Sequence, residues 1–174
     1  MQFIDLKAQY AALKGEIDAN MQDVLNDAAF IGGKYVKELE AQLAAFTGRK
    51  HCITCANGTD ALQLAFMALG VGEGDAVFAP DMTFISSTEP AAMFGAVSVF
   101  CDITPDTYDL DPASLERQIK AVLAEGKYTP KAVVAVDILG NPCDYDAIST
   151  ICEQYGLALS LIHISEPTRL LSIS

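Results

Sequence analysis

Residues 55–62, with the sequence CANGTDAL, form the segment of this chain best suited to holding an anion. They join an expected strand to an expected helix, and Gly58 lets a bound group approach the backbone closely. Thr59 adds a hydroxyl beside the first N–H groups of the helix, which favour negative charge. An ordinary helix cap by Asn57 or Thr59 explains the same residues. The pattern therefore predicts either a phosphate site or a cap.

A second segment, PDMTF at residues 80–84, follows another expected strand. Ligands of α/β proteins collect where parallel strands end, so this segment and residues 55–62 are expected at the same edge of the sheet. Phe84 either covers the face of a planar cofactor there or packs into the core.

Other patterns indicate ordinary structure. The glycines in 70–74 end a helix and precede a strand, which is the reverse of the dinucleotide-binding order. Cys52 and Cys55 form a CxxC, but residues three apart on a strand point to opposite faces, so neither a metal site nor a disulfide is expected. The five scattered cysteines are expected to be buried thiols. His51 is expected to be solvated or capping, and the acidic residues of 102–111 fit no calcium loop and predict a solvated turn.

The bulk composition narrows the function classes. Of the 174 residues 51% are hydrophobic and 20% are charged, so a sizeable core is expected. The formal net charge of -12 repels phosphate backbones and anionic lipid surfaces. We therefore expect neither nucleic acid nor membrane as a partner. No secretory signal or membrane-spanning run is recognisable, which predicts a cytoplasmic protein.

The elements that position these residues follow from the apolar periodicity. Two amphipathic helices come first, one over residues 8–27 and a second that Gly48 stops. Strands are then expected at 51–55, 76–79, 98–102, 132–136 and 157–160, with helices at 58–69, 84–94, 112–124 and 145–155. This alternation predicts an α/β fold with a mostly parallel sheet and helices on both faces.

Taken in order, several segments resemble the DegT/DnrJ/EryC1/StrS family of sugar-nucleotide aminotransferases, which depend on pyridoxal phosphate (PLP). The matching segments are FIDL at 3–6, FIGG at 30–33, NGTDAL at 57–62, PDMTF at 80–84, VFCDI at 99–103, GNP at 140–142 and DYDAI at 144–148. The likeness covers roughly residues 1–160, and the order and spacing of the segments carry it.

The resemblance implies a type I PLP-dependent transferase fold with a truncated large domain. Residues 1–50 would be an N-terminal helical segment, 51–160 part of the PLP-binding α/β domain, and 161–174 a tail outside the family pattern. The implied activity is transfer of an amino group, with glutamate as the expected donor, to a nucleotide-linked ketosugar in amino-sugar biosynthesis for a surface polysaccharide or secondary metabolite. A UDP-linked 3-keto sugar acid is the substrate expected within the family, and the implied assembly is a homodimer.

The resemblance also implies roles for individual residues. Gly58 and Thr59 would hold the PLP phosphate, and Phe84 would lie against the pyridine ring. Residues Phe30, Ile31 and Gly32 would contact the sugar nucleotide. No metal site is implied.

The chain departs from the family after residue 160. Where the family continues into an acidic turn whose Asp pairs with the pyridine nitrogen, this chain reads LIHISEPTRLLSIS, which resembles translated sequencing-adapter sequence. The family's Schiff-base lysine also has no counterpart among the eight lysines present. We therefore expect a fragment without a catalytic residue of its own, and expect that fragment to be inactive.

Two alternatives stay open for the function. One is a PLP-dependent sugar dehydratase of the same fold, in which histidine replaces the Schiff-base lysine. The other is a non-catalytic regulatory domain that binds PLP or a sugar nucleotide.

Overall fold

The computed structural model describes residues 5–163. The chain divides into two units, Met1–Thr54 and Cys55–Ser174, each of which is described by itself. The sequence motif at 3–6 begins outside the described residues, as do residues 164–174 at the other end of the chain. No helix of the described part is long and apolar enough to cross a membrane.

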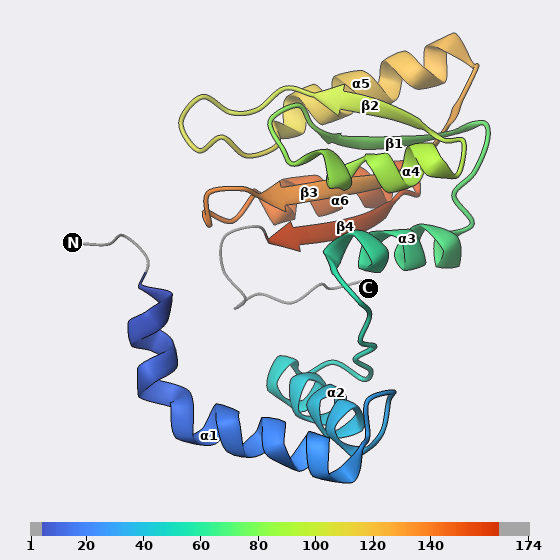
Figure 1. The fold of residues 1–174 in the computed structure, drawn as a ribbon. Coiled ribbons are helices and arrows are strands. Elements are labelled where there is room, and N and C mark those ends of the chain that lie inside the picture. Colours follow the sequence, from blue (N-terminus) through green and yellow to red (C-terminus); the bar gives the residue numbers. More distant parts are fainter. Residues whose placement is uncertain (1–4, 164–174) are drawn as a thin grey trace. The chain divides into compact units, whose positions relative to one another are not determined.

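A four-stranded parallel sheet organises the second unit (Figure 1). The strands lie in the order β2-β1-β3-β4, and every neighbouring pair is parallel. Their bounds are β1 Asp75–Pro80, β2 Val97–Cys101, β3 Thr129–Asp137 and β4 Ala158–His163. The parallel sheet predicted from the sequence is confirmed.

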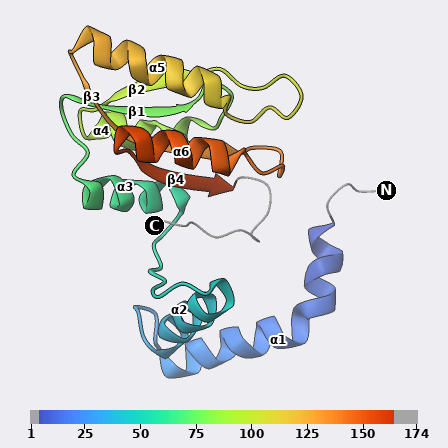
Figure 2. The ribbon, with the colours of Figure 1, turned by 180° about the vertical axis from the view of Figure 1, so that it is seen from behind.

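Helices cover both faces of this sheet. On one face lie α3 (Gly58–Leu69) and α4 (Glu89–Met93), and on the other α5 (Pro112–Glu125) and α6 (Tyr145–Tyr155), which Figure 2 shows from their own side. Successive strand residues point to opposite faces. Phe78 therefore packs toward α5 and α6, whereas Val77 packs toward α3 and α4. Both side chains are fully buried.

The topology determines which ends of the helices lie where the strands finish. Helix α3 runs through the turn at 70–74 directly into β1, so its C-terminus lies where β1 begins and its N-terminus lies near the carboxyl edge of the sheet. The segment 81–84 after β1 and the loops after β2 and β3 also start at that edge. Candidate residues from four parts of the sequence thus converge there.

The first unit consists of two helices, α1 (Leu6–Asp27) and α2 (Lys34–Thr47). Gly48 ends α2 in a left-handed conformation with φ 66°, as its position in the sequence predicts. Neither helix buries a residue. The apolar residues spaced along α1, such as Leu13 and Met21, are exposed in the described structure.

Residues 51–55 do not form the predicted strand. The segment is irregular, and the Thr54 backbone N–H donates to Glu40 Oε1 at 2.9 Å instead of entering a ladder. No strand of the described residues pairs with it, and a strand needs a partner. The accompanying prediction of buried thiols is wrong for Cys55, which is exposed, and for Cys52, which is half-buried.

Two further predictions need adjustment. The helix expected over 84–94 is divided into a short 3-10 turn η1 (Ile85–Ser87) and α4, because Pro90 lacks an N–H and fits only the first turn of a new helix. The final strand, expected at 157–160, runs past residue 160 to His163.

Candidate active site at the carboxyl edge of the sheet

The start of α3 is shaped by Asn57, which caps it. The Asn57 side-chain oxygen accepts the Asp60 backbone N–H at 2.9 Å, and the Asn57 side-chain nitrogen donates to the Asp60 carboxylate at 3.1 Å. Cys55 Sγ donates to the Asn57 carbonyl at 3.2 Å. The capping role predicted for Asn57 is confirmed, and it satisfies the third N–H group of the helix.

The cap leaves the first two N–H groups of α3, those of Gly58 and Thr59, without an acceptor in residues 5–163. Gly58 is exposed and Thr59 half-buried. A Cβ added to Gly58 would meet no atom within 4 Å, so the space beside its backbone is open. Two outward N–H groups, open space and a helix N-terminus together suit a phosphate group. These residues therefore fit the PLP phosphate.

Phe84 stands at the beginning of η1 and is 62% exposed, so packing in the core is excluded for it. The turn that presents it is held by the Ser87 N–H, which donates to the Phe84 carbonyl at 2.9 Å, and by the Thr83 and Ser87 hydroxyls, 2.7 Å apart. Because η1 packs against α3, the ring belongs to the same part of the unit as Gly58. An exposed aromatic ring there fits the flat face of a pyridine.

Phe30, Ile31 and Gly32 lie in the first unit, in the loop between α1 and α2. Phe30 is 68% and Ile31 is 97% exposed, and both glycines of the loop take left-handed conformations, with φ 63° at Gly32 and 95° at Gly33. The loop is thus a pair of exposed apolar side chains followed by a turn that favours glycine.

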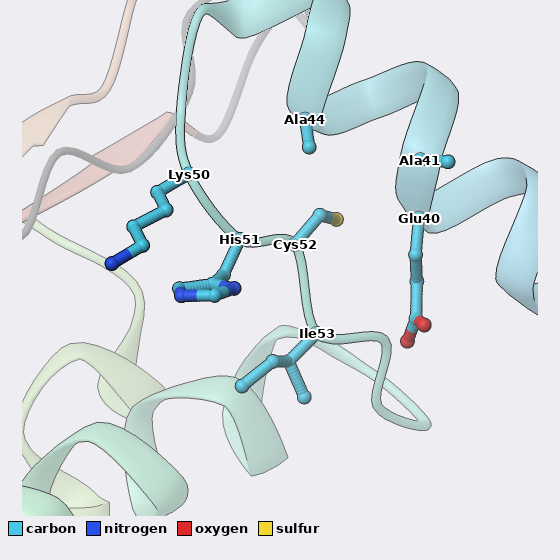
Figure 3. A pocket seen from close by; sticks show the side chains of 7 residues that line it. All are labelled: Glu40, Ala41, Ala44, Lys50, His51, Cys52 and Ile53. Carbon is cyan, nitrogen blue, oxygen red and sulfur yellow. The ribbon is translucent and has the colours of Figure 1, made fainter.

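A hollow of about 270 Å³ also lies in the first unit, between α2 and residues 50–53 (Figure 3). Its lining residues are Glu40, Ala41, Ala44, Lys50, His51, Cys52 and Ile53. Glu40 accepts from both the Thr54 N–H and the Thr54 hydroxyl, at 2.9 and 2.8 Å. These bonds hold the pKa of Glu40 below its usual range. The hollow therefore lies where residues 50–54, which follow α2, are hydrogen-bonded back to that helix.

A buried polar cluster in the second unit was missed in the sequence. Asp137, the last residue of β3, is 2% exposed and accepts the Cys143 N–H at 3.0 Å and the Tyr145 hydroxyl at 2.5 Å. Burial and the bond to Asp137 raise the pKa of Tyr145 above its usual range. A carboxylate directly after the apolar run 132–136 was the available signal, because polar residues at strand ends lie at the carboxyl edge.

Asp109 belongs to the same cluster and contradicts the predicted solvated turn. It is 3% exposed, and the Asn141 side chain donates to its Oδ2 at 2.7 Å. Its neighbour Tyr108 takes a left-handed conformation with φ 63°, which is unfavourable for a side chain of this size. The burial of Asp109 coincides with a left-handed residue before it and with a donor 32 residues away, and periodicity reveals neither.

Three of the five cysteines are buried in this unit, as predicted: Cys101, Cys143 and Cys152. Burial raises the pKa of the Cys101 and Cys143 thiols to about 12 and that of Cys152 to about 11. All three are therefore protonated at neutral pH, and all five cysteines are free thiols.

Comparison with known sequences identifies what this arrangement resembles. The sequence profile of the DegT/DnrJ/EryC1/StrS aminotransferase family matches residues 11–161. A UDP-2-acetamido-2-deoxy-3-oxo-D-glucuronate aminotransferase of Pseudomonas aeruginosa is 48% identical over 159 residues, covering 90% of this chain and 42% of the relative. The chain thus spans about two fifths of the length of this relative.

Solved structures agree with this comparison. A DegT/DnrJ/EryC1/StrS aminotransferase from Brucella abortus superimposes with a TM-score of 0.89 at 42% identity, covering 91% of this chain and 43% of the other. A GDP-4-keto-6-deoxymannose-3-dehydratase, solved with a trapped PLP-glutamate species, gives a TM-score of 0.70 at 28% identity, covering 80% of this chain and 36% of the other. The α/β fold and the resemblance inferred from the sequence are confirmed.

Proposed function

The chain belongs to the DegT/DnrJ/EryC1/StrS aminotransferase family, and on that premise we propose that it serves PLP-dependent transfer of an amino group to a nucleotide-linked ketosugar. The proposed donor is glutamate, and the proposed substrate class is a UDP-linked 3-keto sugar acid. Its 48% identity to the Pseudomonas aeruginosa relative supports that substrate class. The proposed assembly is a homodimer.

The observation that carries the proposal is the start of α3. Gly58 and Thr59 offer two N–H groups to the cofactor phosphate, and the open space beside Gly58 admits it. Asn57 holds this turn in place by capping it through the Asp60 N–H. Phe84, which is 62% exposed, would cover one face of the pyridine ring and exclude water from it. The chemistry that PLP supplies when bound is an electron sink for the amino-acid carbon.

In the first unit, Phe30, Ile31 and Gly32 are proposed to contact the sugar nucleotide. Phe30 and Ile31 are exposed apolar side chains suited to packing against a base or sugar ring. The left-handed Gly32 turns the chain so that both can be presented from one loop.

A chimaeric enzyme tests the proposal. Residues 1–160 of this chain would be joined to the remaining part of the Pseudomonas aeruginosa relative, and glutamate-dependent amination of the UDP-linked ketosugar would be measured. We expect activity and PLP binding, with Gly58→Val weakening PLP binding by more than about ten-fold, because its side chain fills the space beside the two N–H groups. PLP affinity is read from absorbance titrations.

Gly72→Val is the matched control. Gly72 also has an ordinary φ and its Cβ would touch only the Phe94 carbonyl at 3.9 Å, but it lies in the turn before β1, at the opposite edge of the sheet. This variant should bind PLP normally. Equal PLP affinity in a folded Gly58→Val chimaera would refute the phosphate assignment, and an inactive but PLP-loaded chimaera would refute the substrate class.

The dehydratase is the second candidate, favoured by the structural likeness to the GDP-4-keto-6-deoxymannose-3-dehydratase. The two activities differ at the Schiff-base position, which has no counterpart in these 174 residues. Lysine at that position favours the aminotransferase, and histidine favours the dehydratase.

A further inference from the structure

We propose that Asp109, Asp137 and Cys143 form a structural site for a divalent cation of the zinc class. The three residues are 3%, 2% and 5% exposed, and each offers one ligand atom within 4.8 Å of the other two. Asp109 comes from the loop after β2, Asp137 from the end of β3, and Cys143 from the loop before α6. The site goes beyond the proposed function, since it uses neither Gly58 nor Phe84.

An unpartnered oxygen points to a missing ligand. Asp109 Oδ1 is buried and has no hydrogen-bond donor among the described residues 5–163, whereas Oδ2 of the same side chain accepts from Asn141 at 2.7 Å. No lysine, arginine or histidine of residues 5–163 forms an ion pair with Asp109. A buried carboxyl oxygen without a hydrogen-bond partner is unfavourable. A cation beside Oδ1 removes that penalty.

The donor set selects the kind of cation. Two carboxylate oxygens and one thiolate sulfur suit zinc better than calcium or magnesium, which prefer oxygen alone. Zinc lies about 2.1 Å from oxygen and about 2.3 Å from sulfur, so ligand atoms on one ion are roughly 3.5 Å apart and the cluster must contract by about 1 Å. Binding would release the Cys143 proton to solvent, and water would complete the coordination.

The surrounding hydrogen bonds orient the ligands. The Cys143 N–H and the Tyr145 hydroxyl both donate to Asp137 Oδ1, and Asn141 donates to Asp109. Such contacts hold metal-bound carboxylates in place. The loops that supply them start at the same edge of the sheet, as Figures 1 and 2 show. The ion would therefore fasten the loop after β2 to the loop after β3.

Cobalt is the probe for this site, because a thiolate–cobalt bond gives a charge-transfer absorption in the near ultraviolet. The 174-residue chain would carry Cys52→Ser and Cys55→Ser, so that the more accessible thiols beside His51 cannot bind the metal. We expect one equivalent of Co²⁺ to produce the band and one equivalent of Zn²⁺ to displace it. Circular dichroism confirms folding.

Two variants in that background decide the assignment. Cys143→Ser should lose the band, and Asp109→Asn should weaken binding by about ten-fold or more. Cys152→Ser, a buried cysteine outside the cluster, should leave the band and the affinity unchanged. Absence of the band, or its persistence in Cys143→Ser, would overturn the proposal.

Discussion

At the scale of single residues, hydrogen bonds to buried carboxylates hold the carboxyl edge of the sheet together. The Asp137 side chain is 2% exposed, so its oxygens depend on the hydrogen-bond donors that surround them. One of these is the Tyr145 hydroxyl at the start of α6. The bond fastens α6 to the end of β3 and so limits how far the intervening loop can move.

Tyr145→Phe should lower the free energy of unfolding by about 1–3 kcal/mol, because it removes a donor from a buried carboxylate while preserving the ring. Urea denaturation measures the change. Tyr155→Phe is the matched control. Tyr155 ends the same helix, and its hydroxyl donates at 3.1 Å to Glu116 of α5, a half-buried carboxylate that also pairs with Lys120, so loss of this hydroxyl should change stability by less than about 0.5 kcal/mol. Equal effects of the two variants would show that Tyr145 contributes only its ring.

The structural role of a residue was predictable from the sequence where it depends only on neighbouring residues. The Asn57 cap and the left-handed Gly48 follow from their positions at helix ends. The buried position of Asp109 does not, because it requires the strained Tyr108 and an Asn141 donor that lies 32 residues away. Contacts of that separation leave no periodic trace in the sequence.

At the scale of elements, helix α5 shows how the contributions of a helix cap and of an ion pair to stability differ. Asp111 accepts the Ala113 and Ser114 N–H groups at 3.0 and 3.1 Å, and it also lies 3.8 Å from the Arg117 guanidinium. The cap satisfies backbone groups of a helix that buries Leu115 and other core residues, whereas the Arg117 side chain of the ion pair is 65% exposed to solvent.

Asp111→Ala should therefore destabilise the chain by about 1 kcal/mol through loss of the cap. Arg117→Ala, which removes only the ion pair, should change the unfolding free energy by less than about 0.5 kcal/mol. Both are read from urea midpoints at constant pH. If the arginine variant is as damaging as the aspartate variant, the ion pair and not the cap stabilises α5.

The hydrogen bonds that attach residues 50–54 to α2 should depend on pH. Hydrogen bonds from Thr54 lower the pKa of Glu40 below its ordinary value of 4.5. Because the folded pKa is the lower one, the stabilisation is complete above pH 4.5 and disappears as the pH falls through the folded pKa of Glu40. The Thr54 amide shift in NMR spectra should titrate below pH 4.5, and Glu40→Gln should abolish that titration.

The same bonds explain why the element at 51–55 was mispredicted. Its short run of apolar and β-branched residues is typical of a buried strand, but such a run contains no information about a pairing partner. In the described residues the Thr54 N–H has a side-chain acceptor instead. The other four strands were predictable because each is a short apolar run with a neighbour in the sheet.

At the scale of the whole molecule, the alternation of strands and helices was enough to predict the parallel sheet and its two covered faces. The same alternation brings the start of α3, the segment after β1 and the loop after β3 to the carboxyl edge of the sheet. The lysines of the second unit lie elsewhere. Lys127 lies just before β3 and Lys131 near its beginning. Lys120 is on α5, which covers the face of the sheet opposite to the one that α3 covers.

We predict that the 174-residue chain forms no stoichiometric adduct with PLP at any one lysine. A lysine that reacts with an aldehyde must lose its proton, yet carboxylates raise the pKa of Lys14, Lys34 and Lys120, and Tyr128 raises that of Lys127. None of the three lysines of the second unit lies at the edge where Gly58 and Thr59 begin α3.

The measurement is to mix the purified chain with PLP, reduce it with borohydride and map the modified peptides by mass spectrometry. We expect weak labelling spread over several exposed lysines, unchanged by Gly58→Val, because such labelling does not use the proposed phosphate site. Free phosphate should not compete with it either. The prediction is wrong if a single lysine is labelled stoichiometrically and Gly58→Val or free phosphate suppresses that labelling. These 174 residues would then already contain a reactive lysine beside the proposed cofactor site, contrary to the positions of Lys120, Lys127 and Lys131.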